Sequence, residues 1–167
     1  MLRRSKTDRA AAAEPATPEQ VSKGVLVVND DEDMCELLCR VLQSTGHLVA
    51  FRDHSSDGAL EELTEHQSSI DAVILDFTGG TATSFSVLEA IRRKPELDNP
   101  AVIIVATTTA NRVLAFDSGV DEFITRPFHA NDFLTVVTTV LSRTPEEREA
   151  YRTHQTIAGR GLTDLQG

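Results

Sequence analysis

Five short apolar runs alternate along the chain with segments in which apolar residues recur every three or four positions. The runs predict strands over residues 25–29, 47–51, 70–76, 101–106 and 121–125. The helical periodicity between and after them predicts helices over about 34–45, 55–65, 85–94, 110–117 and 133–141. Strands that alternate with helices predict a parallel sheet with helices on both faces. The near-continuous apolar character of the runs agrees, because parallel strands are buried on both sides.

Polar residues stand where these predicted strands end. Asn29 ends the first strand and Asp30 follows it. Asp76 ends the third strand, Thr107 follows the fourth, and Arg126 follows the fifth. Ligands of such sheets bind outside the carboxyl ends of the strands, so we expect these side chains to converge. Carboxylates together with loop carbonyls form an oxygen-rich site that suits a hard cation such as Mg²⁺. The alternative for Asp30 and Asp76 is a pair of surface acids that cap the two strands.

Composition narrows the class of protein. The chain has 167 residues, 40% of them hydrophobic and 25% charged, which is typical of a globular domain. Its net charge of −10 is concentrated in residues 24–142, so we expect no nucleic-acid partner. We also expect no membrane span and no signal peptide, because no apolar run is long enough. Cys35 and Cys39 form no disulfide framework, and a cytoplasmic location is the expectation.

The sequence divides into three parts. Residues 1–23 are rich in alanine, proline and charge, and predict a flexible tail. Residues 24–142 hold the alternating pattern. Residues 143–167 begin with Thr144, Pro145 and Glu147, a capping box that predicts a helix to about residue 156, followed by a loose end. We expect no output domain in these 25 residues.

Four short motifs in order carry a family resemblance: VVND, VILD, VATT and TRPF, at the ends of strands one, three, four and five. Residues 24–142 resemble the receiver domain of two-component response regulators. The resemblance implies a flavodoxin-like α/β fold, a doubly wound five-stranded parallel sheet of order 2-1-3-4-5 with five helices. It also implies a signalling protein rather than an enzyme, which takes a phosphoryl group from a histidine kinase or His phosphotransfer protein.

The same resemblance assigns the metal-binding and phosphoacceptor roles. Asp76 corresponds to the phosphoacceptor, which forms an acyl phosphate. Asp30, Asp76 and the backbone carbonyl of Thr78 correspond to the ligands of Mg²⁺. Asn29 stands where the family has an acid and would act through a metal-bound water, so we expect weak metal binding.

Other positions correspond to the residues that respond to phosphorylation. Thr107 matches the switch hydroxyl, with Ala106 as the alternative, and Phe123 matches the switch aromatic. Arg126 replaces the family's lysine, and a guanidinium can pair with the phosphoacceptor itself. The bond before Pro127 is expected to be cis. The glycine pair at 79–80 replaces a more rigid turn.

Three functions stay open at this point. The first is a phosphorylatable single-domain response regulator that signals by protein–protein contact. The second is a pseudo-receiver with the same fold, acting as a phosphorylation-independent interaction or scaffold module. The third, a flavin- or nucleotide-binding enzyme, is disfavoured because acids after strand one repel phosphate. The target is expected on the face of helix four, strand five and helix five together with the C-terminal extension, which we expect to fold against a partner or a second copy of the chain.

Overall fold

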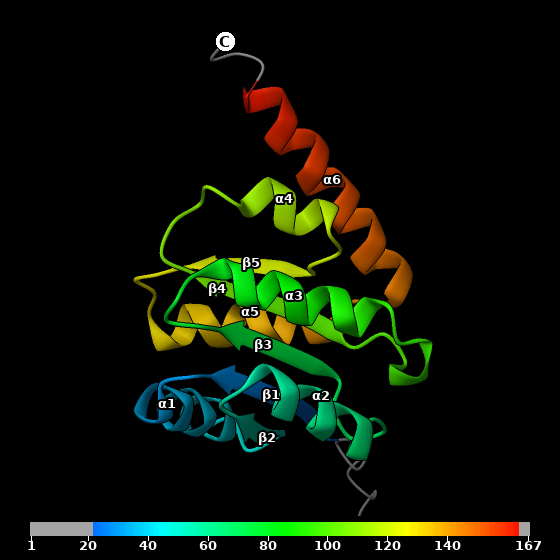
Figure 1. Ribbon diagram of the computed structural model, residues 1–167. Coiled ribbons are helices and arrows are strands. Elements are labelled where there is room, and N and C mark those ends of the chain that lie inside the picture. Colours follow the sequence, from blue (N-terminus) through cyan, green and yellow to red (C-terminus); the bar gives the residue numbers. More distant parts are fainter. Residues whose placement is uncertain (1–21, 164–167) are drawn as a thin grey trace, which may run out of the picture.

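The structure, a computed structural model, describes residues 22–163 (Figure 1). The strands are β1 (Lys23–Asn29), β2 (Leu48–Asp53), β3 (Ala72–Asp76), β4 (Ala101–Ala106) and β5 (Glu122–Thr125). The helices are α1 (Glu32–Gln43), α2 (Ser56–Glu65), α3 (Thr81–Arg92), α4 (Arg112–Asp117), α5 (Ala130–Ser142) and α6 (Pro145–Thr163), with a short 3₁₀ turn, η1 (Pro95–Leu97). The flexible tail predicted for residues 1–23 falls almost wholly outside the described residues.

The five strands form one parallel sheet in the order β2-β1-β3-β4-β5. The predicted flavodoxin-like fold and strand order are therefore confirmed. Register pairs Asn29 with Asp76, which places the last residues of β1 and β3 side by side at the carboxyl edge of the sheet.

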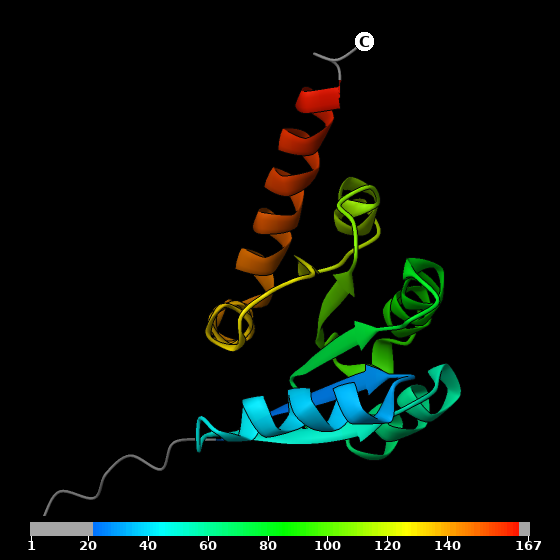
Figure 2. The same cartoon turned by 90° about the vertical axis from the view of Figure 1, so that its left-hand side faces the viewer.

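Successive side chains of each strand point to opposite faces of the sheet and pack in two separate hydrophobic cores. In β1, Val25 and Val27 pack with the apolar stripes of α1 and α5. Leu26 and Val28 face the opposite way and pack with α2, α3 and α4. Both faces of the sheet are thus covered, as Figure 2 shows edge-on, and this explains why the strand sequences are apolar at consecutive positions.

The acids after β1 have a local structural role at the start of α1. Asp31 caps the helix, its side chain accepting the Met34 amide at 3.0 Å. Glu32 and Asp33 occupy the first turn, where negative charge interacts favourably with the helix dipole. These three acids therefore stabilise the start of α1.

The predicted capping box of α6 is present. The amide of Thr144 donates to Glu147 at 2.8 Å, and the amide of Glu147 donates to the Thr144 hydroxyl at 3.2 Å. The predicted end of this helix is wrong, because α6 continues to Thr163 instead of loosening after residue 156. Contacts with α4 explain the extra turns: Arg160 pairs with Asp117 at 3.0 Å.

The expectation that α6 would fold against a partner is also corrected. It packs on its own domain beside α4 and the start of β5 (Figure 1). Arg148 and Thr156 are buried there, with 6% and 9% of their surface exposed. The helix is polar, but its Arg148 guanidinium is buried against the Asp121 carboxylate. No helix within residues 22–163 is long and apolar enough to cross a membrane.

Candidate functional site

The carboxyl ends of β1, β3, β4 and β5 surround a pocket of about 570 Å³. Five of the predicted site residues line it: Asn29, Asp76, Thr78, Thr107 and Arg126. Hydroxyl and amide side chains from the neighbouring loops complete the wall, namely Thr81, Thr108 and Asn111. The parallel topology thus gathers residues that lie up to 97 positions apart in the sequence.

Asp76 is at the base of this site and is 5% exposed. One of its oxygens, Oδ2, accepts the Asn29 side-chain amide at 2.9 Å and also pairs with the Arg126 guanidinium. Burial raises the pKa of Asp76, and the positive charge of Arg126 opposes that rise. Both of these donors bind Oδ2, and Oδ1 accepts from neither of them. The carboxylate is thus held in a defined orientation by two donors on one of its oxygens.

The Asn29 side chain hydrogen-bonds both to Asp76 and to the loop that follows β1. Its amide nitrogen donates to Asp76, and its carbonyl oxygen accepts the Asp31 backbone amide at 2.8 Å. The His54 ring contacts the Asn29 backbone carbonyl at 3.0 Å. A carboxylate at position 29 could not donate to Asp76, so the amide here stabilises the ionised acid without adding charge.

Asp30 is exposed and bridges to the loop that follows β3. Its two oxygens accept the backbone amide and the hydroxyl of Thr78, each at 2.8 Å. The Thr78 backbone amide is the main cause that lowers the pKa of Asp30. The carboxylate is therefore ionised at neutral pH and tied to the residue whose carbonyl is the predicted third metal ligand.

The oxygen donors at this edge of the sheet suit Mg²⁺. They include two carboxylates rather than three, because position 29 is an asparagine. Asp30, Asp76 and the Thr78 carbonyl supply oxygen only, which is what Mg²⁺ prefers. Within residues 22–163 no cluster of three or more His, Cys, Asp or Glu side chains is arranged to hold a metal. Asn29 directs its amide hydrogens toward Asp76, so it adds no anionic ligand.

The remaining predicted residues lie as follows. Thr107 is exposed on the pocket wall, and Ala106, the alternative, lines the same wall but is buried. Phe123 is buried in the core with 3% exposure and is not among the residues that line the pocket. The Arg126–Pro127 peptide bond is cis, as predicted.

Comparison with known proteins decides the family. The family model described as "Response regulator receiver domain" matches residues 25–138. The chain belongs to the response regulator receiver domain family.

Curated relatives of this receiver domain are longer proteins. It is 27% identical over 143 residues to the "DNA-binding dual master transcriptional regulator RpaA" of Synechocystis sp., covering 84% of this chain and 58% of that protein. It is 29% identical over 125 residues to the "Transcriptional regulatory protein TcrA" of Mycobacterium tuberculosis, covering 74% and 48%. The chain thus spans about half the length of these relatives.

Solved structures agree on the fold. The Francisella response regulator 1452 receiver domain matches with a TM-score of 0.64 and 22% identity, covering 73% of this chain and 98% of that one. The chemotaxis response regulator CheY4 of Vibrio cholerae matches with a TM-score of 0.63 and 18% identity, covering 71% and 98%. At these identities the likeness shows the fold alone.

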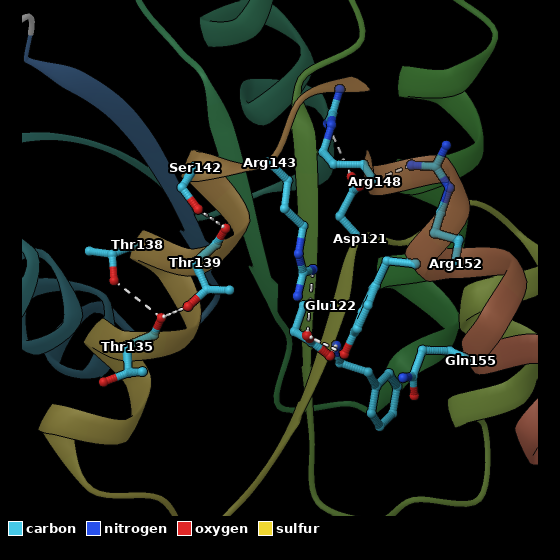
Figure 3. A network of polar contacts seen from close by, with 12 residues as sticks. Asp121, Glu122, Thr135, Thr138, Thr139, Ser142, Arg143, Arg148, Arg152 and Gln155 are labelled. Carbon is cyan, nitrogen blue, oxygen red and sulfur yellow. Dashed lines mark hydrogen bonds and ion pairs between the residues drawn. The ribbon is translucent and has the colours of Figure 1, made fainter. Parts of the chain in front are cut away.

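A second polar cluster, which the sequence did not reveal, lies away from the pocket. Asp121 is fully buried and accepts hydrogen bonds from three arginines, Arg92 at 2.9 Å, Arg148 at 3.3 Å and Arg152 at 2.6 Å. The Val102 amide adds a fourth bond at 2.8 Å. Two of these arginines come from α6, so the cluster fixes that helix to the sheet (Figure 3).

Proposed function

We propose that this receiver domain accepts a phosphoryl group on Asp76 and signals by protein–protein contact. The observation that carries the proposal is the buried Asp76 carboxylate, oriented by Asn29 and Arg126 at the base of a pocket large enough for a phosphoryl group. The family supports the same role. The donor would be a histidine kinase or a His phosphotransfer protein, and the protein would act as a signalling module rather than an enzyme.

The reaction is a transfer between two side chains. A carboxylate oxygen of Asp76 forms a bond to phosphorus while the bond between phosphorus and the donor imidazole breaks. The electron pair of that bond leaves with the ring, which departs neutral because its other nitrogen keeps its proton. The product is an acyl phosphate on Asp76.

The residues around Asp76 would perform distinct tasks in this transfer. Arg126 would move from the carboxylate to the incoming phosphoryl oxygens, where negative charge accumulates. Thr107 lies on the pocket wall and can donate its hydroxyl to the same oxygens. Bound Mg²⁺ would supply further charge neutralisation, held by Asp30, Asp76 and the Thr78 carbonyl.

The test is incubation with acetyl phosphate and Mg²⁺, followed by intact-mass measurement. We expect the mass of one phosphoryl group to be added to the native chain and none to Asp76→Asn. Asp57→Asn, which changes an exposed acid in α2, is the matched control and should label normally. Absence of label on the native chain, under conditions that label another receiver, would contradict the proposal.

One observation favours the alternative, a pseudo-receiver that acts as a phosphorylation-independent interaction module. Arg126 already compensates the charge of Asp76 within the chain, and the Asn29 amide donates a hydrogen bond to the same oxygen. In that case the native chain stays unlabelled, whereas the double substitution Asn29→Asp and Arg126→Lys gains label. The two functions therefore give opposite results in one assay.

A further inference from the structure

Two carboxylates at the start of β5 hold α6. Asp121 precedes the strand and binds Arg148 and Arg152 of α6. Glu122, the first residue of the strand, accepts the Tyr151 hydroxyl at 2.8 Å. Figure 3 shows Asp121 and Glu122 together with Arg148 and Arg152 in this polar network. The three α6 residues lie within two turns of one helix face, so this contact depends on α6 being formed and docked.

The other end of β5 reaches the Asp76 site. β5 has four residues and is an edge strand, with β4 as its neighbour in the sheet. Arg126 follows it directly and pairs with Asp76. One short strand at the edge of the sheet is thus held by charged contacts at both ends, to α6 at its start and to the pocket at its end.

A second route runs through the start of α4. Arg112 donates to the Phe123 carbonyl of β5 at 2.8 Å and to Gln155 of α6 at 3.2 Å. The residue before it, Asn111, lines the Asp76 pocket and donates to Thr81 at 2.8 Å. A shift of the loop before α4 therefore moves a guanidinium that contacts both β5 and α6.

The geometry points to α6 as a latch whose docking is linked to the state of the Asp76 site. Docked α6 fixes the start of β5 and so favours the register in which Arg126 pairs with Asp76. A group on Asp76 that draws Arg126 away favours a shift of β5 and loosens α6. Linkage is reciprocal, so locking α6 in place disfavours modification of Asp76 by the same factor. For its consequence in signalling this inference rests on the proposed function, but the linkage itself does not require phosphorylation.

The first test uses hydrogen exchange on the full chain. Arg126→Met and Asp76→Asn each break the pair between Arg126 and Asp76. Both should speed exchange of the α6 amides at least about fivefold, the lower end of typical coupling between sites, and leave α1 and α2 unchanged. Lys23→Met, which breaks an ion pair with Asp71 elsewhere, should leave α6 unchanged. Unchanged α6 exchange in both variants, or equal acceleration in all helices, overturns the inference.

The reciprocal test locks α6 with a disulfide. A Cβ atom on Gly159 would lie 3.5 Å from the Val113 Cβ of α4, within the range for a disulfide. Replacing Val113 also removes the methyl that would otherwise lie 2.3 Å away. The native Cys35 and Cys39 are buried residues of α1, which packs on the opposite face of the sheet from α4. The variant Val113→Cys with Gly159→Cys can therefore be compared with itself, oxidised and reduced.

With acetyl phosphate, once labelling has levelled off, we expect the ratio of labelled to unlabelled Asp76 to be at least about fivefold lower in the oxidised form than in the reduced form. Equal labelling in the two forms overturns the linkage while the proposed function stands. Absence of label in both forms contradicts the proposed function, and the exchange measurement then decides the linkage by itself.

Discussion

Asp121→Asn is the substitution that tests the role of α6 most directly. It keeps the shape of the side chain and removes the negative charge that three arginines share in a fully buried position. An amide nitrogen in place of either oxygen would also face donors. Removing one partner of a buried ion pair typically costs about 3–5 kcal/mol, because the remaining charge is left uncompensated.

That magnitude is measurable by thermal unfolding. In a domain of this size about 1 kcal/mol shifts the Tm by roughly 2–4 °C, so Asp121→Asn should lower it by roughly 6–20 °C. The matched control is Asp117→Asn, which also removes a carboxylate paired with an α6 arginine. Its pair with Arg160 is exposed, 63% and 51% at the two side chains, and should contribute about 0–1 kcal/mol.

The comparison of the two aspartates decides the argument. A loss for Asp121→Asn that matches the control would show that the buried cluster contributes no more than a surface pair, and that α6 is a dispensable extension. The salt dependence of the Tm gives a second test. Added salt should reduce the small contribution of the Asp117–Arg160 pair to stability and leave the contribution of buried Asp121 nearly unchanged.

Two further predictions concern metal and thiols. Mg²⁺ should raise the Tm of the native chain, by the equivalent of about 2.7 kcal/mol at a hundred times the Kd, and Asp30→Ala should abolish this effect while Asp57→Asn preserves it. An undiminished response in Asp30→Ala would place the metal elsewhere. Burial raises the pKa of Cys35 to about 12 and that of Cys39 in the same direction, so both thiols should resist a thiol-specific reagent at pH 8 and react once the chain unfolds. Rapid reaction of the folded chain at pH 8 would contradict this burial.

The sheet and the site residues at its carboxyl edge could be predicted from the sequence, because both depend on local sequence pattern. Each strand is a short apolar run, and each site residue stands immediately where a run ends. Parallel topology then brings the ends together whatever the length of the connections. The pairing of Arg126 with Asp76 could also be anticipated, since a guanidinium is always charged and reaches further than the carboxylate it neutralises.

The environment of Asp121 could not be predicted in this way. Its arginine partners Arg92, Arg148 and Arg152 lie 29, 27 and 31 positions away in the sequence. Nothing near Asp121 in the sequence distinguishes a buried acid from an exposed one. The available signal was in α6, where Arg148, Tyr151 and Arg152 repeat at helical spacing on one face. Polar residues at that spacing look like a solvent-exposed helix face. Their charge alone does not reveal whether a buried residue of opposite charge lies opposite them.

The position of α6 constrains how any partner can use the surface of α4 and β5. The connection from α5 is short, residues 143 and 144, so α6 is tethered beside this surface at an effective concentration on the order of millimolar or more. Consider a partner helix that binds the bare surface as tightly as α6 does, with a Kd on the order of micromolar. The tethered α6 would compete with it at an effective concentration of about a thousand times that Kd. Such a partner would gain access only when α6 is weakened, and the contacts at Asp121 and Glu122 are where weakening must occur. If β5 links those contacts to Asp76, the acidic residues at the start of this strand determine when the surface becomes available.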